Sequence, residues 1–396
     1  MLNFLDGVRV IDLTSVVLGP YATQILGDFG ADVIKVEPPA GDVLRHVEPA
    51  RNARMGAPYL NSNRNKRSLA IDLKSDGGRA AMLKLLETAD VFVHNLRPKP
   101  VERLGLSYEA LKQINPRLIY CVMVGFGQDG PYADRPAYDD VIQAMSGLAH
   151  LNANDAGDPR FLPIVACDKI GALIGSQAML AAIARQQRTG EGYYIGAPMF
   201  EGVVSYLMIE HLAGRTFRPE RGTMGYDRLL TPYRRPFHTA DGHLAVLPYT
   251  TEQWTRFLTR VGKPEVAQEA RVQDPAERSN HIGELYALLA EAVRTKITAE
   301  WIDILTELDI PFAPVQSLDD VFSDPHLASV GMFEHLEHPS EGPVVNVRPP
   351  YDVRGAESAP DRLAPKLGQH SREVLAEAGL DAAELDALLA SGAIRE

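Results

Sequence analysis

One aspartate in the sequence could carry covalent chemistry. Asp168 follows an apolar run within the segment Ile164-Val-Ala-Cys-Asp-Lys-Ile-Gly-Ala-Leu-Ile-Gly175 and stands where the longest predicted helix begins, at about residues 169–187. As the N-cap, its carboxylate would accept the free amides of the first turn, which is the ordinary role of an aspartate there. Helix-start amides would also hold the carboxylate ionised, and apolar neighbours would exclude the water that weakens it as a nucleophile. The local pattern leaves both roles open.

Two short basic segments could bind a small polyanion. Residues 61–74 and 94–105 each carry an excess of positive charge, although the chain has 40 Lys and Arg against 52 Asp and Glu and a net charge of -12. The acidic balance disfavours a nucleic-acid partner, because phosphate polymers need an extended positive face. A solvated basic surface is the alternative.

The sequence lacks the motifs of several other classes of enzyme and binding site. The turn at residues 14–20 has one glycine where a dinucleotide-binding turn needs Gly-x-Gly-x-x-Gly, and no phosphate loop or Gly-x-Ser-x-Gly elbow is present. His335 and His338 stand in a segment that runs into a proline, so we expect no metal site. Cys121 and Cys167 accompany apolar runs and are expected to be buried thiols.

The elements that must position Asp168 follow an alternating strand and helix pattern, which predicts an α/β fold with a parallel sheet. We expect a large domain at 1–213, a linker at 214–236, a small α+β domain at 237–330 and a return to the large domain at 331–396. Strands are expected at 7–13, 31–37, 91–93 and 118–124, and helices include 21–29 and 76–89. Apolar runs are too short to span a membrane and no secretory signal is apparent, so we expect a cytoplasmic protein.

Blocks distributed along the whole chain resemble the family III CoA-transferases. They are Gly19-Pro20, Leu26 to Pro38, Gly41-Asp42 with Arg45, Asn65 to Leu69, Asn95-Leu-Arg-Pro98, Arg103-Leu-Gly105, Tyr138-Asp139 and Ala364 to His370. Asp168 stands where that family carries its catalytic aspartate.

The resemblance implies transfer of coenzyme A from an acyl-CoA to a free carboxylic acid. Asp168 would form an acyl anhydride and then an aspartyl-CoA thioester, with CoA as a substrate and no permanently bound cofactor. By the same analogy Lys66, Arg67, Arg97 and Arg103 would meet the CoA phosphates. The family also implies a Rossmann-like large domain of N- and C-terminal parts and a homodimer of two interlocked chains.

Two departures bear on the substrate. Formyl-CoA transferase has a glutamine where this chain has Val17, and a glycine run where this chain has residues 247–251. An acyl site lined by Val17 and Tyr138 would favour acids of about four carbons or more, with succinyl-CoA a reasonable donor.

Two other functions are alternatives to CoA transfer. The racemase branch of the family pairs its aspartate with a histidine where this chain has Tyr138, so an acyl-CoA racemase or isomerase is the second hypothesis and a non-catalytic CoA-binding protein is the third. The arginines of 214–236 could bind an extra carboxylate or belong to a charged linker.

Overall fold

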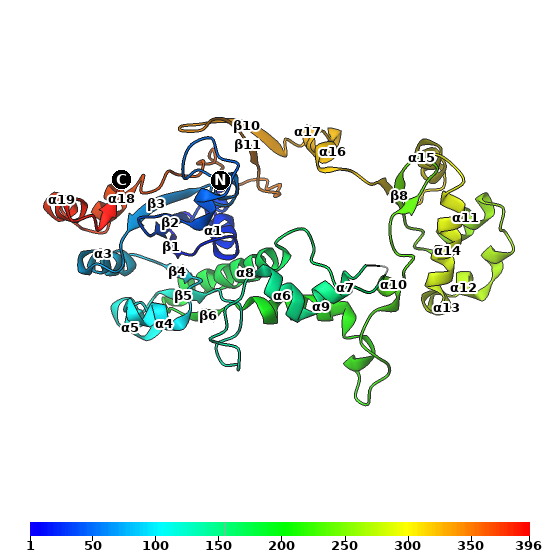
Figure 1. Ribbon diagram of the computed structural model, residues 1–396, viewed down its shortest axis with the longest axis horizontal. Helices are drawn as coiled ribbons and strands as arrows, with labels where there is room; N and C mark the ends of the chain where they lie inside the picture. Colours follow the sequence, from blue (N-terminus) through cyan, green and yellow to red (C-terminus); the bar gives the residue numbers. More distant parts are fainter. Residues whose placement is uncertain (155) are drawn as a thin grey trace. The chain divides into compact units, whose positions relative to one another are not determined.

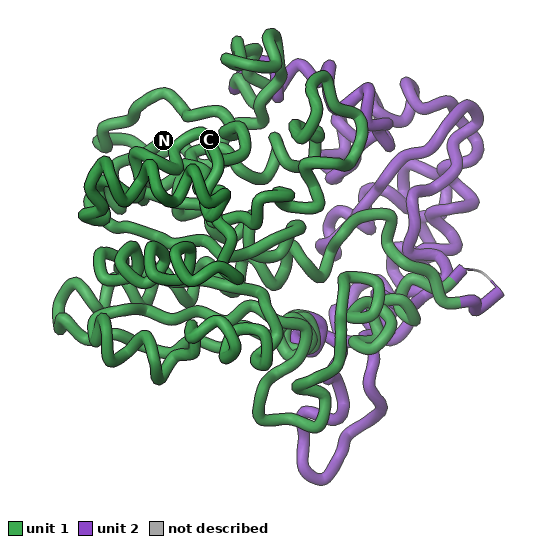
Figure 2. The backbone as a smooth tube through the Cα atoms, turned by 60° about the vertical axis from the view of Figure 1, so that its left-hand side comes forward, with its two compact units in different colours: residues 1–153, 159–206, 331–396 green, residues 154–158, 207–330 purple. Residues whose placement is uncertain are grey.

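The computed structural model describes residues 1–154 and 156–396, which divide into two compact units. Unit 1 comprises residues 1–153, 159–206 and 331–396, and unit 2 comprises residues 154–158 and 207–330 (Figure 2). The C-terminal part of unit 1 begins at Gly331. The predicted linker at 214–236 is part of unit 2 and contains the short helix α10, Asp227–Leu230.

Unit 1 is built on a seven-stranded sheet with the order β12-β3-β2-β1-β4-β5-β6. The strands are β1 Arg9–Leu13, β2 Asp32–Glu37, β3 Lys66–Ile71, β4 Val91–His94, β5 Ile119–Val122, β6 Tyr194–Gly196 and β12 Ile394–Arg395. All neighbours from β3 to β6 pair in parallel, and β12 pairs antiparallel with β3. The four predicted strands correspond to β1, β2, β4 and β5, whereas β3 was not predicted because its sequence begins with two charged residues.

Helices cover both faces of this sheet (Figure 1). On one face α1 packs against α8, and α8 contacts β5; on the other face α3, α5 and α18 bury their apolar sides against the strands. The helices and 3₁₀ turns of unit 1 are α1 Leu18–Asp28, η1 Val43–His46, α2 Ala57–Ser62, α3 Asp76–Glu87, α4 Pro98–Arg103, α5 Tyr108–Ile114, α6 Asp139–Ser146, α7 Leu148–Leu151, α8 Ala166–Thr189, α18 Ser371–Glu377 and α19 Ala382–Ala390. By length and composition α8 alone among the described helices could span a membrane, but half of its apolar stretch is buried within the protein.

The C-terminal part completes the large unit. Strand β12 closes the edge of the sheet beside β3, and α18 packs on β3 and α3. A two-stranded antiparallel hairpin of β10 Phe333–His338 and β11 Gly342–Val347 precedes α18. The Rossmann-like sheet thus depends on residues from both ends of the chain, as the family resemblance implies.

Unit 2 has its own core and a three-stranded antiparallel sheet, β7 Phe237–His238, β8 His243–Val246 and β9 Phe312–Pro314. The turn at Asp241-Gly242 connects β7 to β8, and Asp-Gly is a dipeptide typical of such turns. Trp254 and Trp301 are buried at the centre of the core. The other elements are η2 Ala213–Thr216, α11 Thr251–Arg260, η3 Val266–Gln268, α12 Ala270–Gln273, α13 Pro275–Asn280, α14 Ile282–Val293, α15 Thr298–Glu307, α16 Leu318–Phe322 and α17 Pro325–Ser329; α9, Met199–His211, runs from one unit into the other.

Candidate active site

Asp168 is the third residue of α8 and not its cap. The helix begins at Ala166 with Val165 as N-cap, so the aspartate does not have the N-cap role that the local pattern allows. Its side chain is buried, with 8% of the residue exposed. Its backbone N–H donates to Oδ1 of Asp139 at 2.9 Å, and among the described residues no donor contacts its own carboxylate. The carboxylate is therefore available to a substrate.

The surroundings of Asp168 favour its protonated form. Burial and, second, the negative charge of Asp139 raise the pKa of Asp168 from an ordinary 3.8 to about 7. Asp139 is held in place by α6, where its Oδ2 accepts a hydrogen bond from Gln143 Nε2 at 2.6 Å. A carboxyl group with a pKa near neutrality is typical of a reactive site and is rare for a structural aspartate.

Asp168 lines a cavity of about 370 Å³ in unit 1. The other walls come from the segments that follow β1, β4 and β5, together with residues 133–138 and Met199. Strand β1 pairs with β2 on one side and with β4 on the other. From β1 the strands β2 and β3 follow toward one edge of the sheet, and β4, β5 and β6 follow toward the other, so the strand order switches between β1 and β4. Ligands of open parallel sheets bind at such a switch point, beyond the carboxyl ends of the strands.

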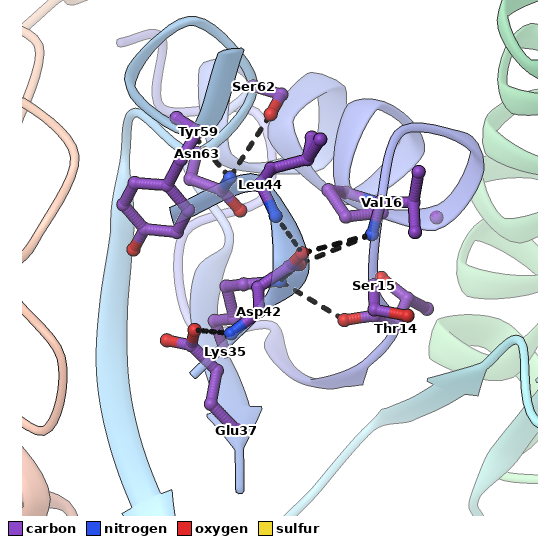
Figure 3. A network of polar contacts seen from close by, with 12 residues as sticks. Thr14, Ser15, Val16, Lys35, Glu37, Asp42, Leu44, Tyr59, Ser62 and Asn63 are labelled. Carbon is purple, nitrogen blue, oxygen red and sulfur yellow. Dashed lines mark hydrogen bonds and ion pairs between the residues drawn. The ribbon is translucent and has the colours of Figure 1, made fainter. Parts of the chain in front are cut away.

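The loop after β1 is held in a strained conformation at this cavity. Val16 has φ 68°, a left-handed value that a β-branched residue rarely adopts. Its N–H donates to Oδ1 of Asp42 at 3.2 Å, and Asp42 in turn accepts from Lys35 Nζ at 2.9 Å (Figure 3). On the other side, Asn95 exchanges hydrogen bonds of 3.1 and 2.8 Å with the backbone of Ser15. Strain that is fixed by surrounding contacts is common at functional sites.

The predicted acyl-site residues lie in different places. Tyr138 lines the cavity with Asp168 and is 71% exposed. Val17 is not among the described residues that line the cavity, whereas Val16 is; both side chains pack against the apolar cluster around Tyr59.

The four residues predicted to contact CoA lie in different environments. Arg97 lines the cavity, and Arg103 is exposed at the end of α4. Lys66 is fully buried on β3, where Nζ donates to Asp12, to the Pro20 carbonyl and to Asn63 at 2.8 to 3.0 Å.

Arg67 is buried as well, and its guanidinium binds Asp32, Glu373 and Glu377. All three donors of Lys66 are occupied, and a guanidinium with three carboxylate partners has no unpaired charge for a phosphate. The basic segment at 61–74 is therefore largely buried around β3 and does not form a basic surface. Arg97 and Arg103 remain the candidates for the phosphates.

Sequence reasoning missed two polar residues of this site. Arg135 lines the cavity, with its guanidinium 4.7 Å from the ring centre of Tyr132, and no carboxylate partner is found for it among residues 1–154 and 156–396. Asp139 contacts the backbone of Asp168. Its place in the Tyr138-Asp139 block was the available signal, whereas the loop around Arg135 showed none.

Metal ligands and thiols have no evident part in the site. Within the described residues, no group of three or more His, Cys, Asp or Glu side chains could hold a metal ion. His338 is buried and contacts the Ala364 carbonyl at 2.9 Å. Cys121 and Cys167 are free and buried, and burial raises the pKa of both thiols to about 12.

Comparison with known proteins agrees with this geometry. The family model for CoA-transferase family III matches residues 5–371. Succinyl-CoA:glutarate CoA-transferase of Mus musculus is 33% identical over 99% of this chain and 90% of its own length. Succinyl-CoA:mesaconate CoA-transferase of Haloarcula marismortui is 33% identical over 95% of this chain and 97% of its own length.

A solved structure of similar sequence has the same fold. The CAIB/BAIF family protein from Brucella suis has a TM-score of 0.80 and 30% identity, over 96% of this chain and all of that one. The chain belongs to CoA-transferase family III, and its mixed α/β fold with a large parallel sheet is that of the CaiB/BaiF structures. It is a CoA-transferase.

Proposed function

We propose that this CoA-transferase moves coenzyme A between carboxylic acids with Asp168 as covalent nucleophile. The observation that carries the proposal is the buried Asp168 carboxyl group, which has no hydrogen-bond donor among the described residues and lines a cavity at the switch point of the sheet. A structural carboxylate buried to this extent would be paired. An acyl carbonyl that enters this cavity would meet an aligned oxygen nucleophile in a site from which most water is excluded.

The proposed reaction has four balanced steps. An Asp168 oxygen attacks the thioester carbonyl of the donor, the carbon–sulfur bond breaks, and CoA leaves as the thiolate from a mixed anhydride. The thiolate then attacks the aspartyl carbonyl, which releases the donor acid and leaves an aspartyl-CoA thioester. The acceptor carboxylate attacks this thioester and expels the thiolate, and the thiolate finally attacks the acceptor carbonyl and frees the Asp168 carboxylate. Thioester and anhydride are of comparable activation, so no ATP is needed.

Asp139 is proposed as a positioning residue for Asp168. It accepts the Asp168 backbone N–H and, by its negative charge, contributes to the pKa of about 7. A carboxylate of higher pKa is a stronger nucleophile once ionised, and a fraction near one half is ionised at neutral pH. The unfavourable charge of Asp139 beside Asp168 therefore supports a catalytic role for Asp168.

Recognition of CoA is assigned to the cations near this cavity. Arg97 and Arg135 line it, and Arg103 lies at the end of α4, the helix that follows Arg97. Guanidinium groups bind phosphate through paired, charge-assisted hydrogen bonds. Lys66 and Arg67 are not included, because their partners within the fold already neutralise them.

We propose dicarboxylic acids of about four or five carbons as substrates, with succinyl-CoA as donor. Relatives are named succinyl-CoA:glutarate and succinyl-CoA:mesaconate CoA-transferases. The walls of the cavity include Val16, Leu18, Met123 and Met199, which offer apolar contact to methylene groups and nothing to formate. The homodimer and the cytoplasmic location remain proposals from the family resemblance and the sequence.

A panel of acyl-CoA donors and carboxylate acceptors tests this function. CoA esters of the acceptor, identified by mass spectrometry, are the expected products. With donor alone, hydroxylamine should convert an activated carboxyl group on the Asp168 peptide to a hydroxamate. Hydrolysis or isomerisation of the acyl-CoA without transfer to any acceptor would refute the proposal.

A further inference from the structure

A buried ion pair of unit 1 lies next to the loop that follows β1. Lys35 Nζ is 2.9 Å from Oδ2 of Asp42, and the two side chains are 0% and 1% exposed (Figure 3). Neither residue is among the described residues that line the cavity of Asp168. Apolar residues of similar shape often replace a buried ion pair without loss of stability, so stability alone does not account for the pair.

The ion pair bridges two backbone groups of the loop. Lys35 Nζ donates to the Thr14 carbonyl at 3.1 Å. The Val16 N–H donates to Oδ1 and Oδ2 of Asp42 at 3.2 and 3.3 Å. Because these two groups stand on either side of Ser15, the pair fixes the backbone before and after that residue. Val16 has φ 68°, a conformation that a β-branched residue keeps only where other contacts hold it.

Asp42 is itself held in one orientation. It caps η1, where its Oδ1 accepts the Leu44 N–H at 3.0 Å. Its own N–H donates to Oε1 of Glu37 at 2.9 Å, and Glu37 accepts two hydrogen bonds of 2.7 Å from Arg45. These contacts fix the carboxylate to β2 and η1, so the loop is held against a rigid support.

The loop that the ion pair holds forms part of the cavity wall. Asp168 lines the cavity of about 370 Å³ together with three residues of this segment, Ser15, Val16 and Leu18. Leu18 also packs against α8, since a Cβ placed on Gly171, about one turn after Asp168, would lie 2.7 Å from Leu18 Cδ1. A shift of the loop would therefore change the space that an acyl group can occupy beside Asp168.

We propose that Lys35 and Asp42 are positioning residues for CoA transfer. They hold the loop after β1 in the conformation that places the acyl carbonyl against Asp168. The inference rests on the proposed function, in which Asp168 is the nucleophile. A displacement of about 1 Å at a reacting centre can lower the rate roughly a hundredfold. The arginines assigned to the CoA phosphates belong to other segments, so a displaced loop should affect the chemical steps more than the binding of CoA.

The test measures chemistry and binding separately in Asp42→Asn, which keeps the shape of the side chain and removes the charge that pairs with Lys35. With succinyl-CoA and glutarate, kcat should fall roughly 10- to 100-fold, and KM for succinyl-CoA should stay within about threefold. In a single turnover with donor alone, release of succinate should slow by a similar factor.

Asp28→Asn is the matched control. It breaks another buried ion pair of unit 1, with Arg64, at the end of α1 that lies away from the loop. Its free energy of unfolding should fall, because a buried guanidinium loses its partner, while its kcat should stay within about twofold of the wild type. A merely structural role of Asp42 would give the same result as this control.

Val16→Gly tests the dependence on the loop conformation. Glycine adopts a positive φ without a steric cost, so in this background the loop should depend less on the ion pair. The fall in kcat caused by Asp42→Asn should be smaller by about threefold or more in the Val16→Gly background than in the wild type. Equal falls in the two backgrounds would contradict the inference.

A second variant covers the case that Asp42→Asn does not fold, as judged by circular dichroism. Lys35→Met combined with Asp42→Asn removes both charges and keeps the shape of the side chains, and it should show the same loss of kcat at an unchanged KM. The inference is overturned if kcat of the folded variant stays near that of the wild type, or if only KM for succinyl-CoA rises. Transfer that persists in Asp168→Asn would instead refute the proposed function.

Discussion

Asp12 and Asp168 are both buried aspartates of unit 1, yet their environments are opposite. Burial alone would raise the pKa of Asp12, but Lys66 and Lys35, with hydrogen bonds from Thr14 and Thr23, lower it to about 2. Asp168 has burial and the charge of Asp139 without a cationic partner, and its pKa is about 7. Asp12 is satisfied and fixed within the fold, whereas Asp168 depends on a substrate. The comparison separates a structural carboxylate from a reactive one by its partners and not by its burial.

The largest effect is expected from removal of the Asp168 nucleophile. Asp168→Asn should lower kcat roughly a thousandfold or more, because a neutral amide is a poor nucleophile, while acyl-CoA still binds. Asp140→Asn is a matched control, since it removes an exposed charge from the neighbouring helix α6. Steady-state kinetics and a CoA binding isotherm measure both quantities. Turnover of Asp168→Asn near the wild-type value would contradict the assignment of Asp168 as the reactive aspartate.

The corresponding change at Asp12 should affect stability. Asp12→Asn leaves the ammonium of Lys66 buried without its ion-pair partner, so the free energy of unfolding should fall by about 3 to 5 kcal/mol. Asp6→Asn, at an exposed position before β1, should change it little. Urea unfolding provides the measurement. A stability loss as small as that of the control would mean that the buried pair is not the support that its geometry indicates.

The two aspartates should also give opposite dependence on pH. Because folding raises the pKa of Asp168 from 3.8 to about 7, its contribution to stability is fully present below about pH 4 and is lost as pH rises through about 7. Asp12, with a lowered pKa, contributes above about pH 4 and loses its contribution as pH falls through about 2.

Asp168→Asn should therefore become more stable than wild type as pH rises, by about 4 kcal/mol at most near pH 8. Unfolding free energies of the two proteins between pH 4 and 9 test this, and parallel curves would contradict it. In the wild type, kcat/KM should increase with pH up to about 7 as the nucleophile ionises.

A smaller effect distinguishes the two basic segments. Arg97→Gln should raise the KM of every acyl-CoA by a similar factor, roughly tenfold, because the CoA phosphates are common to all donors. Arg67→Gln should leave KM unchanged and lower the free energy of unfolding, since this side chain pairs with Asp32, Glu373 and Glu377. Acyl-CoA kinetics and urea unfolding of both variants make the comparison. A loss with Arg97→Gln that is confined to one acyl group would place Arg97 at the acyl site.

The sequence by itself determined the elements whose local patterns are regular. Short runs rich in β-branched residues identified β1, β2, β4 and β5, and the helical period identified α3 and α8. Motif blocks identified the family, which the comparisons confirm, and pointed to Asp168. These features are encoded within short stretches, so neighbouring residues suffice to recognise them.

Only the tertiary structure determined which charged residues are buried and which partners they pair with. The partners of Lys66 and Arg67 include Asp12, Asp32 and Glu377, which are 35 to 310 positions away along the chain. No local pattern shows that a basic stretch will be buried when its counter-ions come from other strands and from helix α18. Burial and pairing are properties of the packed chain, and they determine which charges stabilise the fold and which stay available to a ligand.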